Sequence, residues 1–219
     1  MSFVISSNDY VDYLIDAAAK IAANEEYITK LDSATGDGDH WLNIHSGFQC
    51  FVSEADTLRT LPLNELFKKA GTIMMNKVGG SSGILYGGAY LAAARRIADM
   101  REVEFSDLCG ILESMVEDMC IRGKAEAGYK TMIDTLFPAV VAFKQGLAEN
   151  LDYIIILDSV KQAAIDGAES TREMEAVKGR ASYQQNKGVG HLDPGAVTMS
   201  YQIICLCDRF KRCLLDLRG

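Results

Sequence analysis

Residues 9–30, DYVDYLIDAAAKIAANEEYITK, decide the fold class of this 219-residue chain. Their apolar side chains recur at intervals of three and four residues, which places them along one face of an α-helix. This stripe is formed by Val11, Leu14, Ile15, Ala18 and Ala22. The first part of the chain is therefore expected to be helical.

The same periodicity continues over most of the chain. It predicts further helices at about 41–55, 63–77, 83–100, 106–121, 129–146, 152–176 and 195–216. Residues 152–157, DYIIIL, have the composition of a strand, but a single strand would have no partner with which to pair. We therefore expect an all-α fold of eight helices.

Helices joined by short connections run antiparallel to their neighbours. We expect an eight-helix up-and-down barrel or bundle, with the first, third, fifth and seventh connections at one end. These connections hold 11 of the 19 glycines, at positions 36, 38, 79, 80, 83, 123, 128, 179, 188, 190 and 195, whereas the connections at the other end hold none. Helix C-caps also favour glycine, but capping does not explain why one end alone is enriched. Because glycine allows the backbone to approach a ligand closely, the pattern predicts a ligand site at this end.

Composition limits the classes of partner. A net charge of −8 argues against nucleic acid, because binding to phosphate backbones requires an excess of Lys and Arg. There is no run of 18 uncharged apolar residues and no basic start followed by an apolar stretch, so neither a membrane partner nor a signal peptide is expected. The six cysteines lie mostly on apolar helical faces, where Cys behaves as a small hydrophobe, so we expect a reducing, cytoplasmic location. They include no Cys-x-x-Cys pair, so no zinc site is expected. We expect residues 1–219 to form one domain.

Three aspartates lie close together in residues 31–43, LDSATGDGDHWLN, between the first two predicted helices. Asp37 and Asp39 are two residues apart, so their carboxylates project to the same side of an extended segment, and Asp32 can reach the same point. Hard oxygen ligands select Mg²⁺ or Ca²⁺ over zinc. The segment lacks the glutamate that an EF-hand loop requires at its twelfth position, so Mg²⁺ is the better match.

The glycine-rich connections also match a phosphate ligand. Helices are predicted to follow GDGDH at 36–40, GGSSG at 79–83 and Asp-Pro-Gly at 193–195, and the N–H groups of helix N-termini attract anions. Arg180 can form two parallel hydrogen bonds to a phosphate. Together with the aspartates, these features predict a Mg²⁺-bound nucleotide, although neither the P-loop nor the Rossmann motif is present.

Two side chains beside these loops have open roles. His40 follows Asp39 directly and is interpreted either as a catalytic residue or as a loop histidine that orients a neighbour by hydrogen bonding. Met132 follows the glycine-rich fifth connection, so packing against an adenine ring is one interpretation of it. The methionines inside predicted helices are interpreted as core residues.

Four motifs in this order resemble the ADP-binding L subunit of bacterial dihydroxyacetone kinase. They are GDGDH with Asn43 downstream, GGSSG with LYG, GKAEAGYKTMIDTLFPA, and GRASY followed by GHLDPGA. The similarity extends from about residue 10 to the end of the chain. It implies an eight-helix barrel that binds Mg²⁺ and ADP or ATP among the loops at one end, in agreement with the fold expected above.

The resemblance also implies roles for individual residues. Asp32, Asp37 and Asp39 match the ligands of Mg²⁺, of which two ions are expected. Arg180 and His40 are the expected catalytic residues. The positions that match the nucleotide site are His40, Trp41, Leu42, Asn43, Ser81, Ser82, Gly123, Met132, Arg180, Asp193, Pro194 and Gly195.

The same family implies the partners. A separate K subunit holds the triose through a histidine that this chain lacks, so the chain is expected to be half of an enzyme. Its length without a fused K-type domain favours the phosphotransferase-system branch, in which a phosphohistidine carrier protein recharges a retained ADP. The expected reaction is phosphoryl transfer to dihydroxyacetone or another short ketose, which requires mainly positioning and charge neutralisation. A homodimer is compatible with this arrangement.

Three features depart from the family pattern: Trp41 and Ile84 replace a glycine and a proline, and residues 184–188 read QQNKG. Because the changes lie at the rim where partners must dock, one alternative is a free-standing ATP-dependent kinase subunit for another ketose such as erythrulose. Another is a nucleotide-loaded regulatory module that binds a transcription factor. A fatty-acid kinase shares the aspartate loop, but GRASY and GGSSG favour the ketose branch.

Overall fold

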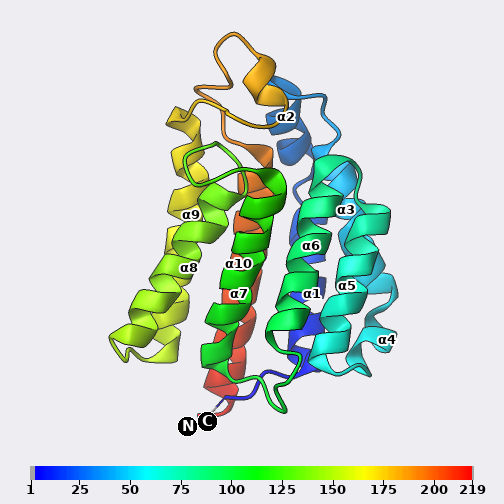
Figure 1. Ribbon diagram of the computed structural model, residues 1–219, viewed down its shortest axis with the longest axis vertical. Helices are drawn as coiled ribbons and strands as arrows, with labels where there is room; N and C mark the ends of the chain where they lie inside the picture. Colours follow the sequence, from blue (N-terminus) through cyan, green and yellow to red (C-terminus); the bar gives the residue numbers. More distant parts are fainter. Residues whose placement is uncertain (1–2, 219) are drawn as a thin grey trace.

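The computed structural model of the chain describes residues 3–218, and helices form its body (Figure 1). The eight long α-helices of this part of the chain are α1 (Ser7–Ala22), α3 (His40–Ser53), α5 (Leu63–Lys77), α6 (Gly80–Arg96), α7 (Phe105–Gly123), α8 (Ile133–Ala148), α9 (Tyr153–Ser170) and α10 (Pro194–Asp216). The shorter elements are α2 (Glu25–Thr35), α4 (Ala55–Arg59) and the 3₁₀ turns η1 (Thr171–Glu173) and η2 (Arg180–Tyr183). Residues 3–218 contain no β-strand, so the prediction of an all-α fold is confirmed.

The eight long helices form a closed barrel. In the order α1, α3, α5, α6, α7, α8, α9 and α10, each helix packs against the next, and α10 packs against α1. Figure 1 shows the helices side by side along the long direction of the molecule. The apolar stripe of the opening segment faces inward, where Val11 and Leu14 are completely buried. The predicted eight-helix barrel is confirmed.

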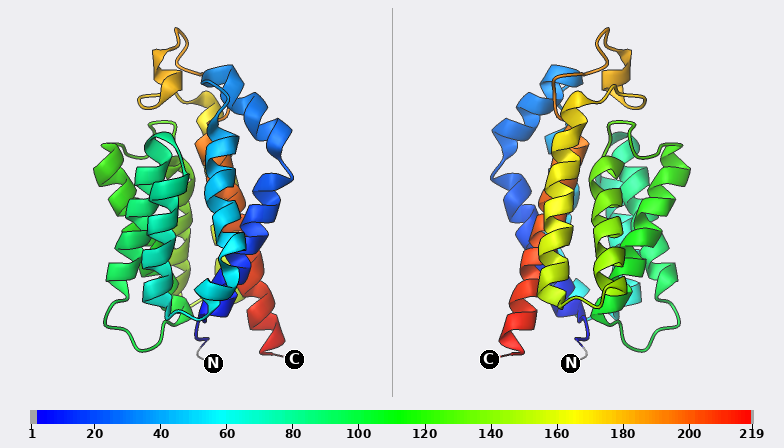
Figure 2. Two further views of the ribbon diagram at one scale, coloured as in Figure 1. Left: turned by 90° about the vertical axis from the view of Figure 1, so that its right-hand side faces the viewer. Right: turned by 90° about the vertical axis from the view of Figure 1, so that its left-hand side faces the viewer.

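The structure corrects the first predicted helix, which is two helices rather than one. α1 ends at Ala22 and α2 begins at Glu25, with Asn24 between them in a non-helical conformation (φ −117°, ψ 25°). The Asn24 side chain donates to the carbonyl oxygen of Lys20 at 2.7 Å and so satisfies an acceptor at the end of α1. The break cannot be seen in the 3.6-residue spacing of apolar side chains, because α2 begins only three residues after α1 ends and continues that spacing. α2 leans over one end of the barrel and carries Asp32 there (Figure 2).

Two other helices are shorter than expected. The predicted helix at 129–146 begins later, at Ile133, because the Asp134 side chain accepts hydrogen bonds from the main-chain N–H groups of Gly128 and Thr131 and holds the preceding residues in a turn. The predicted helix at 152–176 ends early, at Ser170. The connections α7–α8 and α9–α10 are therefore longer than the sequence predicts.

The four glycine-rich connections lie at the same end of the barrel. Figure 1 shows the α2–α3, α5–α6, α7–α8 and α9–α10 connections at the top, and the start of α1 and the end of α10 at the bottom. The α9–α10 connection, residues 171–193, stands above the barrel end (orange in Figure 2). This segment and α2 give the end of the barrel its walls.

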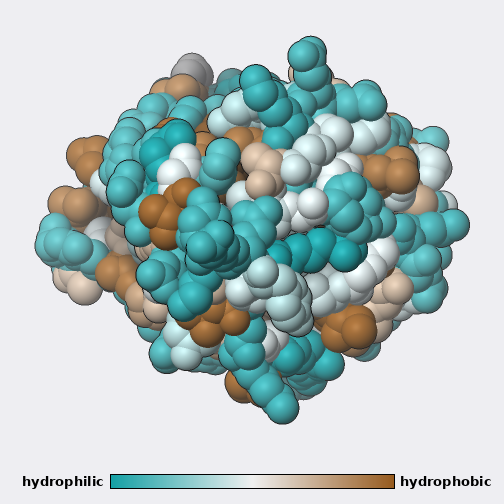
Figure 3. All heavy atoms as spheres, turned by 90° about the horizontal axis from the view of Figure 1, so that it is seen from above, coloured by the Kyte–Doolittle hydropathy of each residue, from teal (hydrophilic) through white to brown (hydrophobic). Residues whose placement is uncertain are grey.

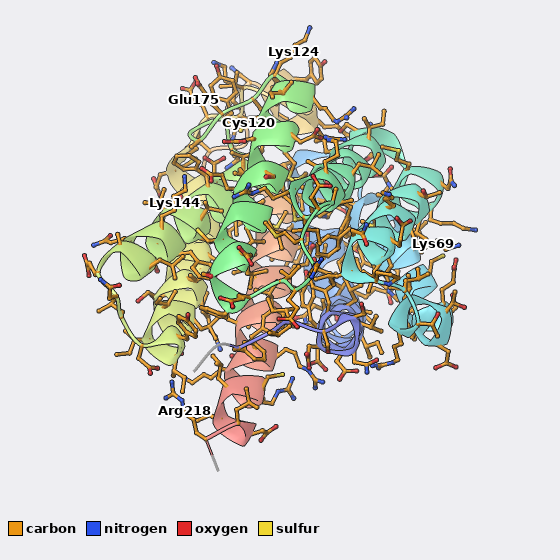
Figure 4. All side chains as sticks on the ribbon, turned by 60° about the horizontal axis from the view of Figure 1, so that its bottom comes forward. Lys69, Cys120, Lys124, Lys144, Glu175 and Arg218 are labelled. Atoms are coloured by element: carbon orange, nitrogen blue, oxygen red, sulfur yellow. The ribbon has the colours of Figure 1, made fainter. Side chains whose placement is uncertain are left out.

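The outside of the barrel carries charged side chains, many of them in ion pairs. Figure 4 shows Lys69 on α5 and Lys144 on α8 at the periphery, where they pair with Glu54 and Glu113. Such exposed pairs contribute at most about 1 kcal/mol each, so the barrel depends on its apolar interior. Within the described residues, no helix has the length and hydropathy needed to cross a membrane.

Candidate functional site

A cavity of about 600 Å³ opens at the glycine-rich end of the barrel. Each of the four connections, with the helix starts that follow them, contributes to its walls, with Asp39, Ser81, Lys130 and Arg180 as examples. Figure 3 looks onto this end and shows hydrophilic residues (teal) over much of it, with separate apolar residues (brown) among them. The structure therefore brings four distant segments together at the place where the glycine pattern predicts a ligand.

The three aspartates of residues 31–43 form one cluster. A carboxylate oxygen from each of Asp32, Asp37 and Asp39 lies within 4.8 Å of the other two. Asp32 is buried, and its Oδ2 accepts the main-chain N–H of His40 at 2.9 Å, which fixes the cluster to the start of α3. The turn depends on glycine: Gly38 has a φ of +80°, which disfavours any residue with a side chain.

Arg180 lies against this cluster. Its guanidinium Nη2 is 2.6 Å from Oδ2 of Asp37 and 3.6 Å from Oδ2 of Asp39. Arg180 is the first residue of η2, which is part of the α9–α10 connection, and its side chain reaches the aspartates across the cavity. Gln184, next to η2, donates to the carbonyl oxygen of Ala34 at 3.1 Å. A cation on segment 171–193 thus offsets the mutual repulsion of the carboxylates on α2 and the α2–α3 turn.

Three helix N-termini face the same cavity. They are the starts of α3, α6 and α10, and the residues there that line the cavity are His40, Asn43, Gly79, Gly80, Ser81, Ser82, Pro194 and Gly195. The start of α6 packs closely on α3, because a Cβ atom at Gly79 would lie 2.4 Å from Oδ1 of Asn43. Main-chain N–H groups at such ends carry partial positive charge, so the arrangement suits an anion.

His40 is held by a second contact besides its main-chain bond to Asp32. Its ring Nε2 lies 2.9 Å from Oγ1 of Thr198 on α10. Burial lowers the pKa of His40, against the opposing charges of Asp32 and Asp39.

Lys130, which is buried, and Asp193, which is half-buried, are two ionisable residues in the cavity wall. Asp193 begins α10, where its Oδ2 accepts the N–H of Ala196 at 2.7 Å, and burial raises its pKa to about 7. Lys130 Nζ donates to the carbonyl oxygen of His191 at 2.5 Å and to that of Thr171, and desolvation lowers its pKa. Lys130 thereby ties both ends of segment 171–193 to the α7–α8 connection.

Most of the residues singled out from the sequence meet at this cavity. Those in its lining are Asp32, Asp39, His40, Asn43, Ser81, Ser82, Gly123, Met132, Arg180, Asp193, Pro194 and Gly195. Asp37 is outside the lining but belongs to the carboxylate cluster.

Trp41 and Leu42 are not brought into the cavity lining. The indole Nε1 of Trp41 donates to the carbonyl oxygen of Ile21 at 3.1 Å, and the indole stacks on His45 with the ring centroids 4.5 Å apart. The Leu42 side chain is 58% exposed. Because successive residues of a helix point in directions about 100° apart, His40 and Asn43 share the cavity face and the two residues between them do not.

Sequence reasoning missed Lys130 and Thr198. Lys130 belongs to the motif GKAEAGYKTMID, in which only Gly123 and Met132 were assigned to the site, and a cation in a glycine-rich loop was a usable signal. Thr198 lies one turn into α10, and no sequence pattern distinguishes it from other residues of the barrel interior. Its contact with His40 depends on how α10 and α3 lie across the barrel end.

The fold and the site define an all-helical barrel protein with one acidic, glycine-rich cavity at its end. The model of the Dak2 family, described as the DAK2 domain, matches residues 34–208. The ADP-binding subunit of PEP-dependent dihydroxyacetone kinase 2 from Listeria innocua is 38% identical over 195 residues, which are 88% of this chain and 90% of that one. The ADP-binding subunit of the corresponding kinase from Escherichia coli K12 is 32% identical over 199 residues, 91% of this chain and 95% of that one.

A solved structure agrees with these sequence matches. The dihydroxyacetone kinase of C. freundii in complex with AMP-PNP and Mg²⁺ has a TM-score of 0.73 and 26% identity to this chain. The match covers 94% of this chain and 35% of that one, so this chain spans about a third of that protein. The chain belongs to the DAK2 domain family, and the resemblance drawn from its four motifs is confirmed.

Proposed function

We propose that this chain is the nucleotide-binding subunit of a dihydroxyacetone kinase, which transfers a phosphoryl group from a Mg²⁺-bound nucleotide to dihydroxyacetone on a separate K-type subunit. The observation that carries the proposal is the convergence of three carboxylates, three helix N-termini and Arg180 on one cavity. The relatives from L. innocua and E. coli, which match nearly the whole of this chain, are named as ADP-binding subunits of such kinases.

The carboxylate cluster fits Mg²⁺. Asp32, Asp37 and Asp39 supply only oxygen atoms, which are the ligands that Mg²⁺ prefers, and they lie close enough to share an ion. We assign two Mg²⁺ ions to this cluster, the number that the family resemblance implies, and phosphate oxygens would complete the coordination that the three side chains leave open. When bound, Mg²⁺ neutralises charge on the phosphoryl group that is transferred.

The other residues of the cavity bind and orient the nucleotide. The N–H groups at the starts of α3, α6 and α10, with the hydroxyl groups of Ser81 and Ser82, donate hydrogen bonds to the phosphates. Arg180 leaves the carboxylates to pair with phosphate oxygens, where its fixed charge stabilises the transition state. Met132 and Gly123 form the part of the wall that accepts adenine.

Residues 1–219 act as one domain, since a single barrel runs from α1 to α10. The phosphoryl donor is a phosphohistidine carrier protein, an assignment that the names of the PEP-dependent relatives support. The cysteines of the described residues are all free, which supports the reducing cytoplasm as the location.

The test is a reconstituted transfer assay. The purified chain is combined with a K-type subunit, phosphoenolpyruvate and the phosphohistidine carrier system, and dihydroxyacetone or erythrulose is supplied as the acceptor. We expect phosphorylated dihydroxyacetone to form only when all components are present. Faster turnover with erythrulose and free ATP would favour the ATP-dependent alternative. No turnover with any ketose would identify a regulatory module and refute the proposal.

A further inference from the structure

Segment 171–193, which stands above the end of the barrel in Figure 2, is a loop whose two ends meet. At this neck, the N–H group of Gly190 donates to the carbonyl oxygen of Arg172 at 2.8 Å. Beside it, the N–H group of Asp193 donates to Oγ1 of Thr171 at 3.0 Å. Any movement of the segment as one unit must therefore alter the contacts at the neck.

The ammonium group of Lys130 lies in this neck. Its Nζ donates to the carbonyl oxygen of Thr171 on one side and, at 2.5 Å, to that of His191 on the other. Lys130 belongs to the α7–α8 connection and is only 2% exposed. Hydrogen bonds from a charged donor are stronger than neutral ones, and the low dielectric of a buried place strengthens them further. A single side chain from outside the segment thus fastens both sides of its neck.

The backbone at Lys130 has a conformation that lysine seldom adopts. Its φ of +60° lies in the left-handed region, where Cβ crowds the following carbonyl oxygen. The Asp134 carboxylate accepts the N–H groups of Gly128 and Thr131, on either side of Lys130, and so fixes this turn to the start of α8. Residues in such conformations persist only where their surroundings hold them, and they are concentrated at functional sites.

Lys130 also packs near the turn that carries Arg180. Gly188, on the returning part of the segment, has a φ of +72°, and a Cβ atom there would lie 3.1 Å from both Cε of Lys130 and Cβ of Ala181. Ala181 follows Arg180 in η2. The lysine stem and η2 therefore both lie against Gly188, so a change at Lys130 is transmitted to the residue that carries the guanidinium.

We propose that Lys130 is a positioning residue whose ammonium keeps the neck of segment 171–193 closed, so that Arg180 remains at the cavity and a bound nucleotide leaves slowly. Without the ammonium, segment 171–193 opens about its neck as one unit, while the helices below it stay folded. Arg180 then spends part of its time away from the phosphates. The effect on the nucleotide rests on the proposed function, whereas the closure of the neck does not.

Hydrogen–deuterium exchange, measured by mass spectrometry on the full-length, nucleotide-free chain, tests the closure. Lys130→Met keeps the apolar stem of the side chain and removes its charge and its donors. Amides of residues 172–190 should exchange about 10-fold faster in this variant, because the neck loses hydrogen bonds from a charged group, whereas α8 and α10 should be unchanged. Unchanged exchange in residues 172–190, or equal acceleration throughout the barrel, would overturn the proposal.

Lys187→Met is the matched control. Lys187 lies in the same segment and also has a left-handed backbone, with a φ of +48°, but its Nζ pairs with Glu175 at 2.8 Å on the surface. The control should leave the exchange and the release of nucleotide unchanged. Equal effects of Lys130→Met and Lys187→Met would overturn the proposal, because the place of the ammonium in the neck would then be immaterial.

A milder variant covers the case in which Lys130→Met does not fold. Lys130→Gln keeps a shorter, uncharged donor, so it should accelerate the exchange of residues 172–190 in the same direction and by a smaller factor. No acceleration there would overturn the proposal.

The release of Mg-ADP tests whether Lys130 acts through Arg180. Displacement of a fluorescent ADP analogue by excess ADP gives the rate for the wild type, Lys130→Met, Arg180→Gln and the double variant. We expect release about 10-fold faster in Lys130→Met, and no further increase when Lys130→Met is added to Arg180→Gln, because the contact that Lys130 positions is then already absent. Additive effects would overturn the positioning role. Exchange as predicted in a chain that binds no ADP would refute the proposed function and leave the closure of the neck standing.

Discussion

The guanidinium of Arg180 and the carboxylate of Asp37 pair across the cavity at 2.6 Å, which joins the α9–α10 connection to the loop before α3. Both side chains are about half exposed, so solvent screens the pair and its contribution to stability is small. The pair matters because Arg180 competes with Mg²⁺ for the carboxylates of Asp37 and Asp39, which we assign to the metal.

Arg180→Gln should therefore strengthen the binding of Mg²⁺ to the nucleotide-free chain while it slows phosphoryl transfer. Loss of one screened positive charge predicts a gain in Mg²⁺ affinity of about 2- to 5-fold, which isothermal titration calorimetry can measure, and which should shrink as salt is added. Lys178→Gln is the control, since Lys178 lines the same cavity and forms no ion pair within the described residues. Weaker Mg²⁺ binding by Arg180→Gln would contradict the competition.

Trp41 should stabilise the corner between α1 and α2. Its Nε1–H group donates to Ile21 at the end of α1, and its ring stacks on His45. Trp41→Phe should lower the free energy of unfolding by about 1 kcal/mol through the lost hydrogen bond, and Trp41→Gly by about 2–4 kcal/mol through lost packing and added backbone freedom. Urea unfolding followed by circular dichroism measures both. Identical stability of all three proteins would show that the indole does not brace the corner.

Asp193 should make the stability of the chain depend on pH. Burial raises its pKa to about 7, from an ordinary value of 3.8, so the folded protein holds a proton there that the unfolded chain releases. A raised pKa gives stability that is complete below about pH 4 and is lost as the pH rises through 7, a change on the order of 4 kcal/mol. Asp193→Asn keeps the acceptor for Ala196 and lacks this titration. In metal-free buffer, the wild type should therefore lose stability relative to Asp193→Asn between pH 4 and pH 8, and a constant difference would exclude a buried neutral carboxyl group.

The fold was predictable because the eight long helices each bury one face, and burial on one face produces the 3.6-residue period. The corner at Asn24 was not predictable in this way, since a hydrogen bond from a side chain to Lys20 breaks the helix without disturbing the period. The turn before α8 was missed for a similar reason, because Asp134 caps it from inside the helix that follows.

The candidate site was predictable where the sequence concentrates one kind of chemistry, as at Asp32, Asp37 and Asp39. Adjacency to a motif was a poor guide to side-chain direction. Trp41 follows His40 directly, yet its indole packs on His45 instead of lining the cavity. Contacts such as that of Thr198 with His40 depend on how two helices lie across the barrel, which a single sequence does not encode locally.

The measurement that tests the central claim most directly is mass spectrometry of the purified, desalted chain after denaturation, for the wild type and for Asp37→Ala. We predict one ADP per chain in the wild type and none in the variant, with the same helical circular dichroism in both. ADP held equally by both proteins would remove Asp37 from the magnesium site, and a wild type that carries and binds no nucleotide would contradict the account as a whole.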